Sequence, residues 1–137
     1  MNDASAADPA GVGRGAAARL FAIAALGEIG VGAAVLVFPQ VLGWLVGQPL
    51  DPAGSIVARL AGCAVLALGS NWWLARDTPA ARARLRPGML VYDFGAAVVF
   101  LLAAMQTPSP VLPAIVALLH IGLGVAAAMV PPGGAGR

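Results

Sequence analysis

The sequence predicts an all-α protein, an integral membrane four-helix bundle with up-and-down topology. Of its 137 residues, 60% are hydrophobic and 10% are charged, whereas soluble domains usually carry about 25% charged residues. Four apolar stretches each approach the roughly 20 residues that a helix needs to cross a bilayer. Outside lipid, such a chain would expose large apolar patches. We therefore expect one membrane domain over residues 16–131, preceded by a disordered leader (1–15) and followed by a flexible tail (132–137).

The first predicted helix covers residues 17–38. It contains the apolar stretch Leu20 to Phe38, which is interrupted only by Glu28, and it ends at Pro39. The Pro- and Gly-rich segment that follows is too short to span a membrane. We expect it to lie in the interface as a short helix or loop, with the Trp44 indole at the level of the lipid headgroups.

The other three helices are delimited by caps and prolines. Ser55 is a suitable N-cap for a second helix over 56–76. Pro87, a residue favoured in the first turn of a helix, begins a third helix over 88–106. The turn TPSP then leads to a fourth helix over 111–130, which two prolines end. We expect Trp72 and Trp73, near the end of the second helix, to lie in an aromatic belt at the interface.

Basic residues are unevenly distributed among the connections. All eight are arginines. Seven of them lie in or beside the leader, in the connection around residues 76–86 and in the tail, and the eighth, Arg59, lies in the second predicted helix. The other two loops contain none. The positive-inside rule then places both termini and the connection around residues 76–86 in the cytoplasm. No aromatic residues are interleaved with a basic patch, so no nucleic-acid partner is expected. The expected partners are the lipid bilayer and other membrane subunits or a second copy.

Two polar side chains are expected near the middle of the membrane. Glu28 lies halfway along the first helix, and His120 halfway along the fourth. Each belongs to a stripe of small residues that would let helix backbones approach closely. The two side chains could bond each other, or each could bond a neighbouring backbone carbonyl or hydroxyl instead. Arg59, in the second helix, either extends to the headgroups or reaches Glu28.

A second polar cluster is expected nearer the cytoplasmic face. Asp93 and Tyr92 follow the predicted start of the third helix by only a few residues, and Asn71 and Arg76 lie at a similar depth near the end of the second. We expect an Asp93–Arg76 or Asp93–Asn71 contact. Most such pairs in membrane helices stabilise the bundle by about 1 kcal/mol.

Familiar catalytic and metal-binding motifs are missing from the sequence. The single cysteine, Cys63, excludes an intrachain disulfide and a cysteine-based metal cage, and we expect it to be buried as a small apolar residue. One histidine cannot supply bis-histidine haem ligation. We therefore predict no catalytic residue, no metal site and no bound cofactor, except that a quinone remains a candidate ligand.

The stretch RLAGCAVLALGSNWWLARD (Arg59 to Asp77), with its Arg-x-x-Gly start and its Trp- and Arg-rich end, resembles the second helix of DoxX-like small bacterial membrane proteins. The segments FPQVLGWLVG and ALLH are also similar to that group. The resemblance implies a four-helix bundle in the inner membrane of a bacterial cell. In the branch that gave the group its name, such a subunit belongs to a thiosulfate:quinone oxidoreductase. No catalytic residue is transferred, because no redox motif matches.

Three functions are consistent with the sequence. The first is a non-enzymatic subunit or accessory factor of a membrane complex, in which the polar residues hold the bundle together or contact a partner. The second is a quinone-binding subunit of a membrane oxidoreductase, in which His120 and Glu28 bond the quinone oxygens and relay protons. The third is a small oligomeric transporter or proton path. The first function requires the fewest assumptions, because every polar residue has a structural explanation.

Overall fold

The computed structural model describes residues 9–130, with side chains from Gly15 onward, and this part of the chain consists of helices joined by short turns, without any strand. This confirms the all-α class. There are five helices: α1 (Pro9–Val37), α2 (Gln40–Val46), α3 (Pro52–Ala75), α4 (Pro79–Gln106) and α5 (Val111–Met129).

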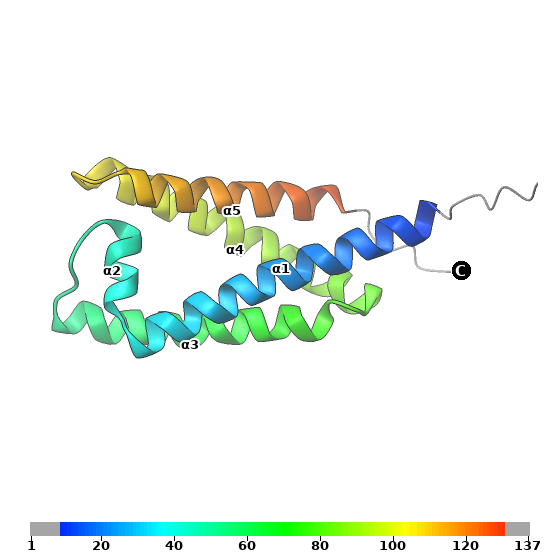
Figure 1. Ribbon diagram of the computed structural model, residues 1–137, viewed down its shortest axis with the longest axis horizontal. Coiled ribbons are helices and arrows are strands. Elements are labelled where there is room, and N and C mark those ends of the chain that lie inside the picture. The colour runs from blue at the N-terminus through cyan, green and yellow to red at the C-terminus, as the bar shows by residue number, and fades with distance from the viewer. Residues whose placement is uncertain (1–8, 131–137) are drawn as a thin grey trace, which may run out of the picture.

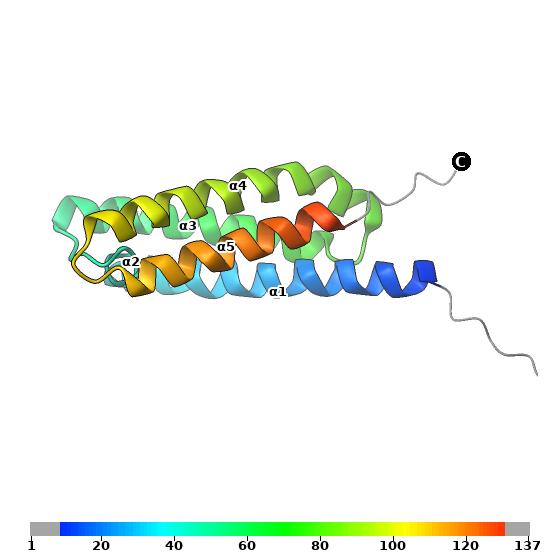
Figure 2. The same cartoon turned by 90° about the horizontal axis from the view of Figure 1, so that it is seen from above.

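The four long helices run along one axis in alternating directions (Figures 1 and 2). In Figure 1, α1 and α3 form one layer and α4 and α5 the other, while the short α2 stands across one end between the layers. The α3–α4 connection, the first turns of α1 and the last turn of α5 lie together at the opposite end. The predicted up-and-down bundle is confirmed.

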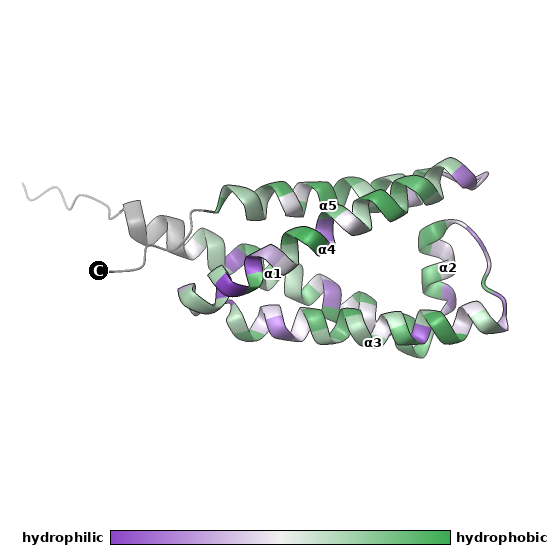
Figure 3. Ribbon diagram, turned by 180° about the vertical axis from the view of Figure 1, so that it is seen from behind, coloured by the Kyte–Doolittle hydropathy of each residue, from purple (hydrophilic) through white to green (hydrophobic). Residues whose placement is uncertain are grey.

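All four long helices are apolar and long enough to cross a membrane, so the chain is a multi-pass membrane protein. Hydrophobic residues cover most of their length, and hydrophilic residues gather where α3 meets α4 (Figure 3). At 1.5 Å per residue, the 28 residues of α4 extend about 42 Å. This exceeds a hydrocarbon core about 30 Å thick, so the arginine-rich first turns of α4 project beyond it.

Glycines bring α1 and α3 into direct backbone contact. A Cβ atom added to Gly62 would lie 2.8 Å from the Leu36 nitrogen, and one added to Gly32 would lie 2.8 Å from the Gly62 carbonyl oxygen. A Cβ atom on Gly69 would likewise lie 2.8 Å from the Ile29 nitrogen. Because no side chain fits at these points, the close packing of this helix pair depends on glycine.

The second pair, α4 and α5, packs through a larger side chain. Phe94 of α4 lies over Gly124 of α5, where an added Cβ atom would be 3.0 Å from the ring. Contacts within each pair are extensive, whereas α1 meets α5, and α3 meets α4, through few residues. The bundle therefore consists of two tightly packed helix pairs that touch each other lightly.

The end that carries α2 is closed by hydrogen bonds. Thr107 is buried and donates its hydroxyl hydrogen to the Gly47 carbonyl over 2.7 Å. Gly47 ends α2 with φ +74°, a backbone conformation that favours glycine, and a Cβ atom there would also collide with the Thr107 hydroxyl. Trp44 is exposed on α2, as an interfacial indole should be. The short helix expected after the first span is thus present and anchored to the α4–α5 turn.

Three helices begin earlier than the sequence predicts. α1 starts at Pro9, so part of the expected leader is helical, whereas residues 1–8 and the predicted tail 132–137 lie outside the described residues. The N-cap of α3 is Asp51, which accepts a 2.6 Å hydrogen bond from the Gly54 nitrogen, and not Ser55. Asp51 precedes Pro52 at the first helical position, a combination that favours helix initiation.

The start of α4 differs most from the prediction. The helix begins at Pro79 and continues through Pro87, which the sequence suggested as its first residue. The arginines of the expected loop are therefore helical. Arg82 donates to the Arg76 carbonyl at the end of α3, and Arg86 donates to the Ala128 carbonyl at the end of α5. Cationic donors stabilise the unpaired carbonyls at helix C-termini.

We predict that Gly62→Ala destabilises the protein by about 1–3 kcal/mol, the usual cost of an overpacked core, because the new methyl group would collide with the α1 backbone. Gly95→Ala is the matched control. An added Cβ atom at Gly95 meets nothing within 4 Å, so its higher helix propensity should stabilise the protein by up to about 1 kcal/mol. Unfolding in detergent, followed by circular dichroism, measures both. Equal effects of the two substitutions would contradict the backbone contact between α1 and α3.

Candidate functional site

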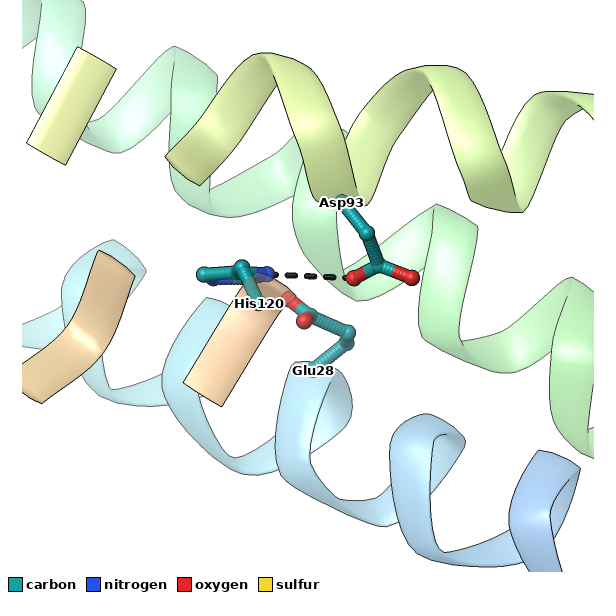
Figure 4. A group of neighbouring side chains, drawn as sticks. All are labelled: Glu28, Asp93 and His120. Atoms are coloured by element: carbon teal, nitrogen blue, oxygen red, sulfur yellow. Dashed lines mark hydrogen bonds and ion pairs between the residues drawn. The ribbon is translucent and has the colours of Figure 1, made fainter. Parts of the chain in front are cut away.

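Four polar side chains meet in the middle of the bundle, and we call them the central cluster: Glu28 of α1, Tyr92 and Asp93 of α4, and His120 of α5. Figure 4 shows Glu28 and Asp93 extending toward each other from opposite helices, with the His120 ring beside both. Asp93 is completely buried, and Glu28 and His120 are 7% and 9% exposed. The cluster therefore lies where the two helix pairs face each other.

Two hydrogen bonds organise the central cluster. The Tyr92 hydroxyl donates to Glu28 Oε2 over 2.7 Å, which links α4 to α1. His120 Nδ1 lies 3.1 Å from Asp93 Oδ1, which links α5 to α4. The two bonds share α4, so they connect three helices. Because hydrocarbon offers no competing partners, polar groups at this depth must satisfy one another within the protein.

Aromatic rings surround the central cluster. Trp72 of α3 is 1% exposed and packs edge-on against Tyr92, with 5.7 Å between ring centroids. Phe100 stacks on His120 at an interplanar angle of 8°. Tyr92 also meets the imidazole edge-on. These rings fix the orientation of the hydrogen-bonding groups and lower the local dielectric, which strengthens every electrostatic interaction among them.

One atom of the central cluster has no polar partner among the described residues. Asp93 Oδ2 is buried and makes no hydrogen bond to any of them, although Oδ1 of the same carboxyl is paired with His120. An unpaired carboxylate oxygen in an apolar interior is costly. The cluster also contains two carboxyl groups and one imidazole, so it has more capacity for negative than for positive charge. Both features mean that the site can accept a further positive charge, either a proton or a cation.

The predicted cytoplasmic-side cluster is not formed. Asn71 is exposed and donates to the Ala67 carbonyl, one turn earlier in its own helix. Arg76 stacks on Trp73 and pairs with Asp77. Asp93 contacts neither residue. The physical reason is the early start of α4 at Pro79, which moves Asp93 from the end of the helix to its middle.

The expected midplane site is formed in part. Glu28 and His120 do lie in one cluster, but their hydrogen bonds go to Tyr92 and Asp93. The small-residue stripes do not pack on each other, because Gly32 contacts α3 and Gly124 contacts Phe94 of α4. Arg59 is exposed on α3, and among the described residues it forms no ion pair with Glu28.

Two further expectations are wrong. Trp72 is a core residue against Tyr92 and not part of an aromatic belt. Cys63 is exposed on α3 and not buried. Both residues belong to α3, and this helix is rotated about its axis relative to the expectation. Its face with Gly62 and Gly69 packs on α1 and leaves Cys63 outside.

Tyr92 and Asp93 are the residues of the central site that sequence reasoning placed elsewhere. A signal was available, since the segment 79–87 contains no residue that forbids a helix beginning at Pro79. Proline in the first turn of a helix is common, and proline inside a transmembrane helix is tolerated. Extending the helix by this segment would have placed Asp93 at the depth of Glu28 and His120.

Comparison with known proteins finds no matching family model, no curated relative and no similar solved structure. The chemistry of the central cluster therefore has to be argued from its geometry. A carboxyl group, a phenol and an imidazole in contact can exchange protons and bond a polar ligand. The carboxylate oxygens and the imidazole nitrogen are also suitable metal ligands.

We predict that Asp93→Leu destabilises the protein by about 3–5 kcal/mol, because it removes one partner of a buried pair and leaves His120 without a hydrogen bond. The double substitution Asp93→Leu/His120→Leu should cost less than the sum of the two single substitutions, since no polar group is then left unpaired. Unfolding in detergent measures all three variants. Strictly additive losses would show that Asp93 and His120 do not interact.

Proposed function

We propose that this chain is a non-enzymatic subunit or accessory factor of a membrane complex. The observation that carries the proposal is the presence of glycines inside transmembrane helices that face outward. An added Cβ atom at Gly27 or Gly30 of α1, at Gly95 of α4 or at Gly122 of α5 would meet nothing within 4 Å. No described residue of the chain packs against these glycines.

Glycine in a helix interior costs about 1 kcal/mol relative to alanine. Inside the bundle, close helix packing offsets that cost, because Gly32, Gly62 and Gly69 let the backbones of α1 and α3 touch. Small residues on the outer face of a membrane helix likewise let a helix of another chain approach its backbone closely. Gly27 and Gly30 lie one turn apart on the exposed face of α1, near the middle of the span, where a partner helix could approach closely.

The proposed location is the bacterial inner membrane, with both termini in the cytoplasm. Arg76, Arg82, Arg84 and Arg86 lie at the end of the bundle where α3 meets α4. The opposite end, with α2 and the α4–α5 turn, has no lysine or arginine between residues 38 and 51 or between 107 and 110. This asymmetry supports the orientation through the positive-inside rule. The likeness of Arg59 to Asp77 to DoxX-like proteins supports the assignment as a small bacterial membrane subunit.

A quinone-binding subunit is the second candidate, and the central cluster favours it. Tyr92 and His120 could donate to quinone oxygens, and Glu28 could exchange protons with them. Buried ionisable groups at mid-membrane depth are typical of proton and ligand pathways. For the same reason, a small oligomeric transporter or proton path is the third candidate.

We predict that Gly27→Leu/Gly30→Leu releases the chain from its complex without unfolding it. The new side chains face outward, so the isolated chain should unfold at an unchanged or higher temperature. They would occupy the space that a partner helix needs. Native gel electrophoresis of the membrane extract should then show the variant at the size of the single chain, where the wild type migrates in a larger assembly.

The matched control is Ile23→Leu, which alters an exposed residue of α1 without changing its bulk. It should leave the assembly intact. A double-glycine variant that stays in an assembly of wild-type size would contradict the proposed interface on α1.

A further inference from the structure

We propose that Glu28, Asp93 and His120 form a binding site for one divalent transition-metal ion inside the membrane domain. One ligand atom from each residue can be chosen so that all three lie within 4.8 Å of one another. The three residues come from three different helices, α1, α4 and α5. This inference does not depend on the proposed subunit role.

The three ligand atoms would have to move only slightly closer together to bind one metal ion. Ligand atoms about 2.0–2.2 Å from a metal lie roughly 3.0–3.5 Å from one another. His120 Nδ1 and Asp93 Oδ1 are already 3.1 Å apart, so this edge of a coordination sphere is in place. The three ligand atoms lie within 4.8 Å of one another, so the Glu28 carboxylate, which points toward the other two side chains in Figure 4, would have to approach them by roughly 1 Å to complete the set.

The charge of the site favours a divalent ion. Two carboxylates and a neutral imidazole around an ion of charge +2 give a neutral assembly, and neutrality matters most where the dielectric is low. Metal binding would also use the buried Asp93 carboxyl, whose Oδ2 has no hydrogen bond. The same carboxyl could bind through one oxygen or both.

The neighbours of these residues resemble the outer shell of a metal site. Tyr92 donates to Glu28 and would orient its carboxylate, as outer-shell hydrogen bonds do for metal ligands. Trp72 and Phe100 enclose the tyrosine and the imidazole. Asp93 is fully buried while Glu28 and His120 retain small exposed areas, so an ion would enter on the side of Glu28 and His120.

The donor set selects the class of metal. Two carboxylate oxygens and one imidazole nitrogen suit zinc, manganese or ferrous iron, whereas copper(I) prefers thiolate and thioether ligands. The only thiol of the chain, Cys63, is exposed on α3 and not part of this site. We commit to zinc or manganese because both bind mixed oxygen and nitrogen donors without needing a redox partner. A bound ion would join α1 to α4 and α5, and so would tie the two helix pairs together.

The test uses the full chain in lipid nanodiscs, purified without a histidine tag and stripped with a chelator. Zn²⁺ or Mn²⁺ is then titrated by calorimetry, and thermal unfolding is followed with and without the ion. We expect one ion per chain and a rise in the unfolding temperature, because a ligand that binds only the folded state stabilises it. Glu28→Gln and Asp93→Asn should each weaken binding tenfold or more.

Tyr92→Phe keeps all three ligands and should weaken binding about tenfold, the usual effect of losing an outer-shell partner. Asp77→Asn removes an exposed carboxylate beside Arg76 and should leave binding unchanged. If the folded wild type binds neither ion saturably, or if Glu28→Gln and Asp93→Asn both bind as tightly as the wild type, the proposal is wrong. Because the wild-type titration decides first, a variant that fails to fold does not affect the outcome.

Discussion

A carboxyl group in the middle of a membrane must find its partners within the protein, since lipid offers none. This constraint explains the arrangement of the bundle around Glu28 and Asp93. Each acid bonds a side chain of another helix, Tyr92 for Glu28 and His120 for Asp93. Helices α1, α4 and α5 must therefore keep the register and rotation that bring these groups together, and a shift of one residue along any of the three would leave a buried polar group unpaired. The polar contacts thus specify one arrangement among many with similar apolar packing.

The two kinds of contact have different roles. Within each pair, packing depends on close approach, through backbone contact at Gly62 in one pair and through Phe94 over Gly124 in the other. Between the pairs there are few contacts, and hydrogen bonds from α4 supply directional ones, from Tyr92 to Glu28 in the central cluster and from Arg82 to the Arg76 carbonyl at the end of α3. Dispersion within the pairs stabilises α1 with α3 and α4 with α5, because backbones that touch gain many small attractions. The site where a proton, a quinone or a metal ion would act lies at the junction, where small movements of one pair against the other would alter it.

The sequence was sufficient for the fold class and for the position of two site residues near the middle of their helices. Apolar segment lengths and the placement of arginines predict four spans, and Glu28 and His120 lie halfway along theirs. The partners of these residues were not predictable in the same way. Hydropathy reports where a span lies in the membrane but not where its helix begins, so starting α4 at Pro87 placed Asp93 near an end. Rotation about the helix axis is also invisible to hydropathy when both faces are apolar, and for that reason Trp72 and Cys63 were assigned to the wrong environments.

The central claim is that the buried polar cluster joins the two helix pairs, and the Tyr92–Glu28 hydrogen bond is its most direct link. A double-mutant cycle with Tyr92→Phe, Glu28→Leu and both together, followed by reversible unfolding in detergent, isolates the interaction between these residues. We expect a coupling free energy of about 1–3 kcal/mol, the range for a hydrogen bond to a carboxylate that water cannot replace. A coupling near zero, with the single effects adding, would contradict the account.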